Sequence, residues 1–308
     1  MAIYLAPGEF TLHDAPFQFD SRTQASEVRL FATGSAVIQA ELSSLLRISS
    51  GAPLVRLSGL TFRSQIAVEG GELQIENCTF DNSSADLGGA LHVTDGVVRV
   101  DTTTFVSNRA RKGGAFYAAG GLTTFRGCDF KGCVASEPDG GGAIFVEAGD
   151  VVLAPLLAEH QVPIATTRLY DNHAGPGGIL ESIYRTGGHL EYQLPAPLGH
   201  FIDFGLDSNS TDAFTLRSDT SYPDFPLACA AGVFGNSFIQ TEQSTKLCSG
   251  LCPAGKTCGM ATINPVPCRQ GGYCPEGSQI VSPCEAGSFG NETGARDSSV
   301  CLACPKGH

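Results

Sequence analysis

The stretch Phe105–Ala115, FVSNRARKGGA, decides the fold when it is set beside Phe80–Ala90, FDNSSADLGGA. Both begin with a Phe and end with Gly-Gly-Ala, and the whole unit that starts at Phe80 starts again at Phe105. The middle is basic in one copy and acidic in the other. Further copies place the Phe at Phe62 and Phe130, and a degenerate copy begins at Leu169. Such self-similarity indicates one structural unit repeated along the chain.

Apolar residues alternate with period two within each copy, as in ALHV (90–93) and AFYA (115–118), and Gly-rich turns separate them. This pattern indicates strands of three to five residues, too short to be stable alone. The sequence therefore predicts an all-β parallel β-helix with one coil per repeat and a coil spacing of ~4.8 Å. The Phe is expected to stack inward, and Gly-Gly to allow positive φ or close backbone approach. The residues between them are expected outside. A leucine-rich repeat would need Leu at fixed positions, which the copies lack.

Composition limits the partners and the location of the chain. The net charge of -12 argues against nucleic acid, which requires a clustered cationic surface. No apolar run approaches the ~18–20 residues of a membrane span. The N-terminus MAIYLAPGEF lacks the basic and apolar regions of a signal peptide.

The cysteines nevertheless point to export. Three precede Cys229, and the other nine lie close together from there to the end of the chain: Cys229, Cys248, Cys252, Cys258, Cys268, Cys274, Cys284, Cys301 and Cys304. This density is typical of a disulfide-rich domain in an oxidising compartment. Sequons for N-glycosylation agree with export: Asn77, Asn82, Asn209 and Asn291. We expect a fragment of a longer extracellular or cell-surface protein.

A second repeat organises the chain from Cys229 onward, because CAAGVFGN from Cys229 returns as CEAGSFGN from Cys284. Local pairing could join Cys229 to Cys248 and Cys284 to Cys301, with Cys252, Cys258, Cys268 and Cys274 pairing among themselves and Cys304 left over. The sequence does not determine this connectivity. A zinc array would need paired Cys and His, and the tail has only His308. Truncation is expected after CPKGH, where another Cys would follow.

The three early cysteines are a separate question. Cys78 and Cys128 both lie two residues before a Phe, but two coils apart. Equivalent positions would be ~9.6 Å apart, beyond the ~7 Å Cα limit of a disulfide. A Cys128–Cys133 bond stays open, and so does the interpretation of all three as buried thiols.

Two resemblances follow from these motifs. The paired motifs F-x-x-N and G-G-A-[ILVF] resemble the repeats of chlamydial polymorphic outer-membrane proteins. They also resemble related right-handed β-helices of the pectate-lyase-like superfamily. In this chain the first motif is complete only as FVSN (105–108). The tail CRQGGYCPEGSQIVSPCEAGSFGN resembles the ephrin-receptor-like cysteine-rich repeat, a relative of tumour-necrosis-factor-receptor modules. The combination is similar to surface proteins of algae and other protists. It implies a right-handed β-helix over 1–185, a strand-containing junction or cap over 186–228 and cysteine-rich repeats over 229–308, in a non-catalytic structural or adhesion module.

The search for chemistry finds few candidates. The Asn-Thr-Asp, Asp-Asp and Gly-His-Gly motifs of related hydrolases are absent. We therefore expect no catalytic residue, metal site or cofactor, and keep a polysaccharide lyase or hydrolase as the alternative. Asp203 and Asp207 near His200 are interpreted as a polar loop. Four loop acids could contact Ca²⁺ but are typical turn formers: Asp81, Asp86, Asp139 and Asp171.

Binding has a better candidate. If Leu91, Phe116 and Ile144 face inward, then His92, Tyr117 and Phe145 form an outward aromatic row on successive coils. An exposed row could bind an extracellular glycan by stacking, or a surface protein, unless a neighbouring segment covers it. A basic cluster flanks the row and could meet an acidic polysaccharide or only solvent: Arg99, Arg109, Arg111 and Lys112. A purely structural spacer is the remaining hypothesis.

Overall fold

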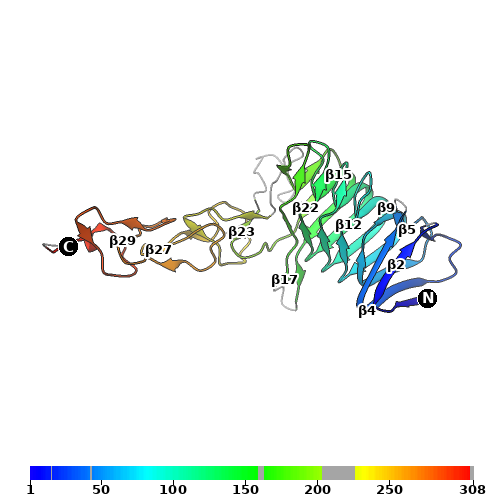
Figure 1. Ribbon diagram of the computed structural model, residues 1–308, viewed down its shortest axis with the longest axis horizontal. Coiled ribbons are helices and arrows are strands. Elements are labelled where there is room, and N and C mark those ends of the chain that lie inside the picture. Colours follow the sequence, from blue (N-terminus) through cyan, green and yellow to red (C-terminus); the bar gives the residue numbers. More distant parts are fainter. Residues whose placement is uncertain (15, 42–43, 159–162, 203–225, 306–308) are drawn as a thin grey trace. The chain divides into compact units, whose positions relative to one another are not determined.

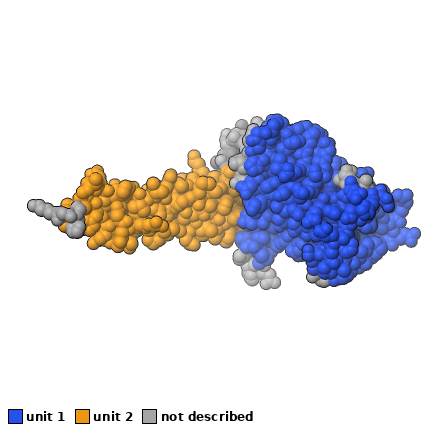
Figure 2. Space-filling model, in the orientation of Figure 1, with its two compact units in different colours: residues 1–193, 204–225 blue, residues 194–203, 226–308 orange. Residues whose placement is uncertain are grey.

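The computed structural model describes residues 1–14, 16–41, 44–158, 163–202 and 226–305. It contains two compact units, residues 1–193 with 204–225 and residues 194–203 with 226–308 (Figure 2). The first unit is a parallel β-helix of about six turns, and the second is disulfide-rich with short antiparallel hairpins. The predicted all-β class and β-helix are confirmed. Within the described ranges, no helix is long and apolar enough to cross a membrane.

Each coil contributes strands at three positions, and strands at equal positions pair in parallel (Figure 1). The first position holds β3 (Phe17–Phe19), β5 (Ser44–Ile48), the starts of β7 (Gln65–Glu76), β9 (Leu91–Asp101), β12 (Phe116–Arg126) and β15 (Ile144–Ala154), and β21 (Ile183–Arg185). The second holds β1 (Ala2–Leu5), the starts of β4 (Glu27–Ala40) and β6 (Leu54–Phe62), the ends of β7, β9, β12 and β15, and β22 (His189–Tyr192). The third holds β2 (Gly8–Leu12), the ends of β4 and β6, β8 (Thr79–Asp81), β10 (Thr104–Val106), β13 (Asp129–Lys131) and β18 (Arg168–Tyr170).

Shorter strands complete the coils. A small sheet contains β11 (Arg109–Ala110), β14 (Val134–Ala135), β19 (His173–Ala174) and β20 (Ile179–Leu180). A hairpin is formed by β16 (Leu156–Leu157) and β17 (Pro163–Ala165).

The repeated phenylalanines form a stack inside the β-helix. Phe62, Phe80, Phe105 and Phe130 share one register in adjacent coils and are fully buried. Their ring centroids are 5.0, 5.0 and 4.5 Å apart in that order. These distances match the ~4.8 Å spacing of paired strands, which confirms the predicted inward stack.

The two glycines of Gly-Gly-Ala serve different purposes. The first, as in Gly113, has φ +60°, a conformation that side chains disfavour. The second has no room for a side chain, because a Cβ on Gly114 would lie 2.1 Å from the carbonyl oxygen of Gly142 and 2.7 Å from the nitrogen of Val134. Both predicted reasons for the motif therefore apply, one to each glycine.

The centre of the repeat is less free than expected. The third residue after the Phe is buried in each copy, as Ser83, Asn108, Cys133 and Asn172. The side chain of Asn108 accepts a hydrogen bond from the backbone N–H of Ser83 (2.9 Å) and donates one to the carbonyl of Phe80 (3.0 Å). The expectation that all intervening residues lie outside is wrong here, because buried backbone groups at this corner need partners.

The early cysteines are free thiols. Cys78, Cys128 and Cys133 are all buried and unbonded, so neither a Cys78–Cys128 nor a Cys128–Cys133 disulfide forms. Thr103 and Thr167, on the next coils, accept hydrogen bonds from the backbone N–H groups of Cys78 and Cys128. Burial raises the pKa of Cys78 and Cys133 to about 11 and that of Cys128 to about 12. The interpretation as small buried thiols is confirmed.

Four disulfides hold the second unit: Cys229–Cys248, Cys252–Cys258, Cys268–Cys274 and Cys284–Cys301, with Cys304 free. Cys229–Cys248 and Cys284–Cys301 are the two pairs suggested by the repeat, whereas the sequence left open how the four cysteines between them pair. The hairpins are β23 (His200–Phe201) with β24 (Leu227–Ala228), β25 (Val233–Phe234) with β26 (Gly250–Leu251), β27 (Lys256–Thr257) with β28 (Val266–Pro267), β29 (Gly272–Tyr273) with β30 (Ser282–Pro283), and β31 (Ser288–Phe289) with β32 (Leu302–Ala303). A 3-10 helix, η2, spans Ser298–Val300.

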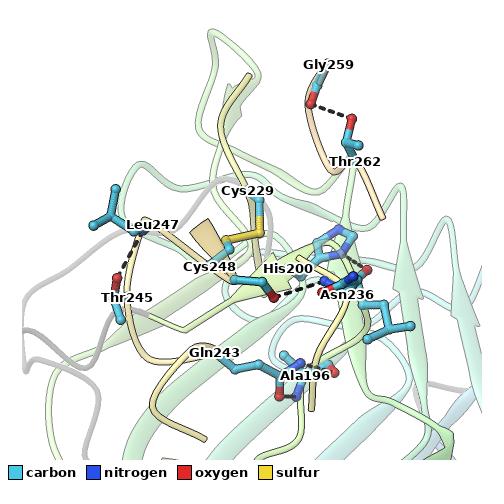
Figure 3. Close-up of a disulfide and its surroundings, with 12 residues drawn as sticks. Ala196, His200, Cys229, Asn236, Gln243, Thr245, Leu247, Cys248, Gly259 and Thr262 are labelled. Atoms are coloured by element: carbon cyan, nitrogen blue, oxygen red, sulfur yellow. Dashed lines mark hydrogen bonds between the residues drawn. A yellow bond between two sulfur atoms is a disulfide. The ribbon is translucent and has the colours of Figure 1, made fainter. Parts of the chain in front are cut away.

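The segment 194–202 packs into this second unit. Figure 3 shows the Gln243 side chain beside Ala196, where it accepts a hydrogen bond from the backbone N–H (3.0 Å) and donates one to the carbonyl (2.8 Å). The Cys229–Cys248 disulfide packs with Phe201 in a small core. Of the expected junction 186–228, β22 thus pairs within the β-helix, residues 194–202 belong to the second unit, and Asp203, Asp207 and Asn209 lie outside the described residues.

Candidate functional site

The predicted aromatic row is correct in register. His92, Tyr117 and Phe145 pair in sequence across β9, β12 and β15, and Tyr184 of β21 extends the row. The rings of Tyr117 and Phe145 stack with centroids 5.2 Å apart, and His92 meets Tyr117 edge-on at 5.4 Å.

The expectation that this row is exposed is wrong. Tyr117 is only 4 % exposed and Phe145 only 1 %. The Gly-Gly turn packs against this face, since a Cβ on Gly88 would lie 2.9 Å from the backbone nitrogen of Tyr117. Lys112 covers the Phe145 ring, with Nζ 4.7 Å from its centroid. A neighbouring segment therefore covers the row, which was the alternative interpretation. The rings of Tyr117 and Phe145 offer no stacking surface to a glycan.

Polar groups complete this cover. The Tyr117 hydroxyl donates a hydrogen bond to Glu147 (2.8 Å), and burial raises the pKa of Tyr117 above its usual range. Burial also lowers the pKa of the half-buried His92. The row is thus a structural stack of rings that is held by a hydrogen bond from Tyr117.

A different surface carries the stronger candidate site. A groove of about 460 Å³ lies on the outer face of the second strand position. Its first row is Arg29, Arg56, Gln74 and Arg99, which occupy one register on four successive coils. Because adjacent coils are ~4.8 Å apart, these side chains form a ladder along the axis.

A second row runs parallel to the first, two residues further along each strand. It consists of Phe31, Ser58, Glu76, Asp101 and Arg126, again in one register. Inward residues between the rows, such as Leu57, belong to the buried core and form the floor. The floor of the groove is therefore the wall of the β-helix itself.

Carboxylates hold the groove arginines without burying them. Glu27 bonds to Arg29 (2.8 Å) and to Nε of Arg56, while Glu72 bonds to Arg99. The side chains of the three arginines remain 57 %, 44 % and 48 % exposed. A guanidinium has five N–H donors, so each arginine keeps donors for a ligand while its position is fixed.

The groove also offers an aromatic edge. Phe31 lines it, and the exposed Tyr4 meets Phe31 edge-on with centroids 5.5 Å apart. At the other end, Arg126 donates two hydrogen bonds to Asp101, which raises the pKa of Arg126. Planar hydrogen-bonding groups and an exposed ring together suit a polyhydroxylated ligand.

The other sequence candidates are dispersed. Arg99 lies in the groove, whereas Arg111 binds Asp86 and Glu137 on the turn side, and the hydrogen bond from Arg111 lowers the pKa of Asp86. Asp139 and Asp171 occupy positive-φ turn positions, as expected of turn formers. Among the described residues, no group of three or more His, Cys, Asp or Glu could hold a metal ion.

Sequence reasoning missed the groove, although a signal exists. The triplets Val28-Arg29-Leu30, Val55-Arg56-Leu57 and Val98-Arg99-Val100 each place an Arg between two apolar residues. On a half-buried strand that pattern points the Arg outward. The triplets become neighbours only when coils of unequal length are aligned, since the interval from Phe62 to Phe80 is shorter than that from Phe80 to Phe105.

Comparison with known proteins adds no family. No family model, curated protein or solved structure matches this chain.

Proposed function

We propose that this chain is a non-catalytic extracellular or cell-surface adhesion module that binds a linear glycan in the arginine groove. The observation that carries the proposal is the ladder of Arg29, Arg56 and Arg99, held on one register and left about half exposed. Such side chains hydrogen-bond sugar hydroxyls or carboxylates in fixed directions.

The extracellular location has independent support. Four disulfides in the second unit are favoured in an oxidising compartment. Three of the sequon asparagines lie among the described residues, and all three are exposed, as glycosylation requires: Asn77, Asn82 and Asn291. The second unit would then act as a spacer that presents the β-helix.

The proposal is tested by a combined binding and turnover screen. The chain, secreted from an oxidising host, is incubated with a panel of neutral and acidic polysaccharides, and both retention and release of reducing or unsaturated ends are measured. We expect saturable retention without product. Release of product that depends on a loop carboxylate would establish a polysaccharide lyase or hydrolase instead. The absence of both signals would favour a structural spacer.

Two arginine variants locate the binding site. Arg56→Ala removes the central guanidinium of the ladder and should weaken retention about tenfold or more, the loss expected for a charge-assisted hydrogen bond. Arg168→Ala is the matched control, because Arg168 is equally exposed and ion-paired across coils to Asp129 but lies outside the groove. Equal effects of both variants would contradict a groove site.

A further inference from the structure

We propose that Asn77 carries an N-linked glycan at the rim of the arginine groove, and that this glycan restricts access to the groove. The inference rests on the proposed function for its consequence, but not for the modification itself. Asn77-Cys78-Thr79 is a sequon, and the Asn77 side chain is exposed.

Asn77 lies directly beside the groove. It follows Glu76, a member of the second groove row, at the corner where each coil turns from its second to its third strand. The equivalent corner residues are Gly59, Thr102 and Gly127, and all four have φ between +46° and +68°. This column of corners adjoins the second groove row, because each corner residue directly follows a member of the row from Ser58 to Arg126.

The folded position of the Asn77 side chain is compatible with a glycan already attached to it. Its Oδ1 accepts a hydrogen bond from the Thr102 hydroxyl (2.7 Å) on the following coil. The amide nitrogen Nδ2, on the other branch, has no hydrogen-bond partner among the described residues. On the preceding coil the equivalent corner is Gly59, which has no side chain to obstruct a sugar. The exposed Asn77 amide nitrogen is therefore the atom to which we assign the first sugar.

The transfer itself is ordinary glycosylation. Nδ2 attacks the anomeric carbon of an oligosaccharide linked to a polyisoprenoid diphosphate. A C–N bond forms, the anomeric C–O bond to the diphosphate breaks, the polyisoprenoid diphosphate leaves, and the amide loses one proton. The reaction takes place on the secreted chain during export, before the corner folds.

The structure supplies a matched pair of sequon variants. Thr79→Val removes the Asn77 sequon while leaving Asn77 and its positive φ intact, and valine suits strand β8. Ser84→Ala removes the sequon of Asn82, which is exposed at the far end of β8 and does not line the groove. The two sequons are five residues apart on one coil, so they differ mainly in position relative to the groove.

The test uses the full chain secreted from a glycosylating eukaryotic host. Peptide mass spectrometry measures occupancy at Asn77. Phenylglyoxal, which modifies exposed guanidinium groups, then probes Arg99 and Arg126 in the groove against Arg168 outside it. We expect faster modification of Arg99 and Arg126 in Thr79→Val, unchanged modification of Arg168, and no change at any of the three in Ser84→Ala. An unoccupied Asn77, or equal rates in both variants, would overturn the proposal.

Binding separates this inference from the proposed function. Polygalacturonate and unsubstituted xylan serve as acidic and neutral probes. If the groove binds either, Thr79→Val should lower its Kd about tenfold, equivalent to about 1.4 kcal/mol. The two variants can also both fail to retain either polysaccharide while Arg99 and Arg126 are still modified faster in Thr79→Val. In that case the Asn77 glycan shields the groove as inferred, and the proposed glycan-binding function is wrong. If a probe binds with one Kd to both variants, the access role is wrong.

Discussion

The β-helix leaves its three cysteines reduced and buried, whereas the second unit uses eight of nine in disulfides. The β-helix buries a continuous stack of rings from Phe62 to Phe130. The second unit exposes large apolar side chains such as Met260 and Ile280, and its described core around Cys229 is small. The difference shows that one chain can obtain stability from repeated burial in one region and from cross-links in another.

Reduction should separate the two regions most strongly. In the chain-entropy account each disulfide contributes about 2–3 kcal/mol, so losing four should unfold the second unit. Hydrogen exchange followed by mass spectrometry, with and without dithiothreitol, should show lost protection over 194–202 and 226–305 but not in the β-helix. Simultaneous loss of protection in the Phe62–Phe130 coils would break the comparison.

The Gly-Gly turn should be the most sensitive point of the β-helix. Gly114→Ala places a methyl group against backbone atoms of two neighbouring segments and should cost about 3 kcal/mol or more in unfolding free energy. Gly177→Ala, in the degenerate copy, is the control, because nothing lies within 4 Å of its added Cβ. Urea unfolding monitored by circular dichroism measures both. Similar midpoints for the two variants would refute the close-approach explanation.

The buried Asn108 should matter next. Asn108→Ala leaves the N–H of Ser83 and the carbonyl of Phe80 without these partners, at an expected cost of about 2 kcal/mol. Thr104→Ala on the adjoining strand serves as the control and should change the midpoint little. An unchanged unfolding midpoint in Asn108→Ala would mean that water takes over the hydrogen bonds made by the amide.

The smallest effect concerns alkaline pH. The pKa of Cys128 is about 12 in the folded β-helix, against about 8.5 for an unperturbed thiol. A raised folded pKa means that the stabilisation is complete below about pH 8.5 and is lost as the pH rises towards 12. Between pH 9 and 10 the free energy of unfolding of the β-helix, measured by urea titration, should fall by on the order of 1 kcal/mol more in wild type than in Cys128→Ala. Parallel pH profiles would show that this thiol is not protected by burial.

Much of the fold was accessible from the sequence because the β-helix repeats its requirements. Each coil needs one inward position and one tight turn. Phe80 and Phe105 mark the inward position in two copies, and the Gly-Gly-Ala after each marks the turn. The inner position of Asn108 was not recognised, because only Asn172 of the degenerate copy repeats the residue type, while Ser83 and Cys133 replace it in the two neighbouring copies.

The candidate site was less accessible. Period two alone places Tyr117 and Phe145 on an outward face, but whether a turn covers that face depends on how the Gly-Gly segment returns over it. The groove arginines come from coils of unequal length, so their common register is set by strand pairing and not by a constant interval.

The sequence by itself determined the β-helix, the inward Phe stack, the disulfide-rich second unit and the absence of a Cys78–Cys128 disulfide, because each follows from a local pattern and a fixed coil spacing. Only the tertiary structure decided that the aromatic row is covered and that Arg29, Arg56 and Arg99 line an open groove. Exposure depends on segments distant in the chain, and alternation along one strand contains no information about what packs on it.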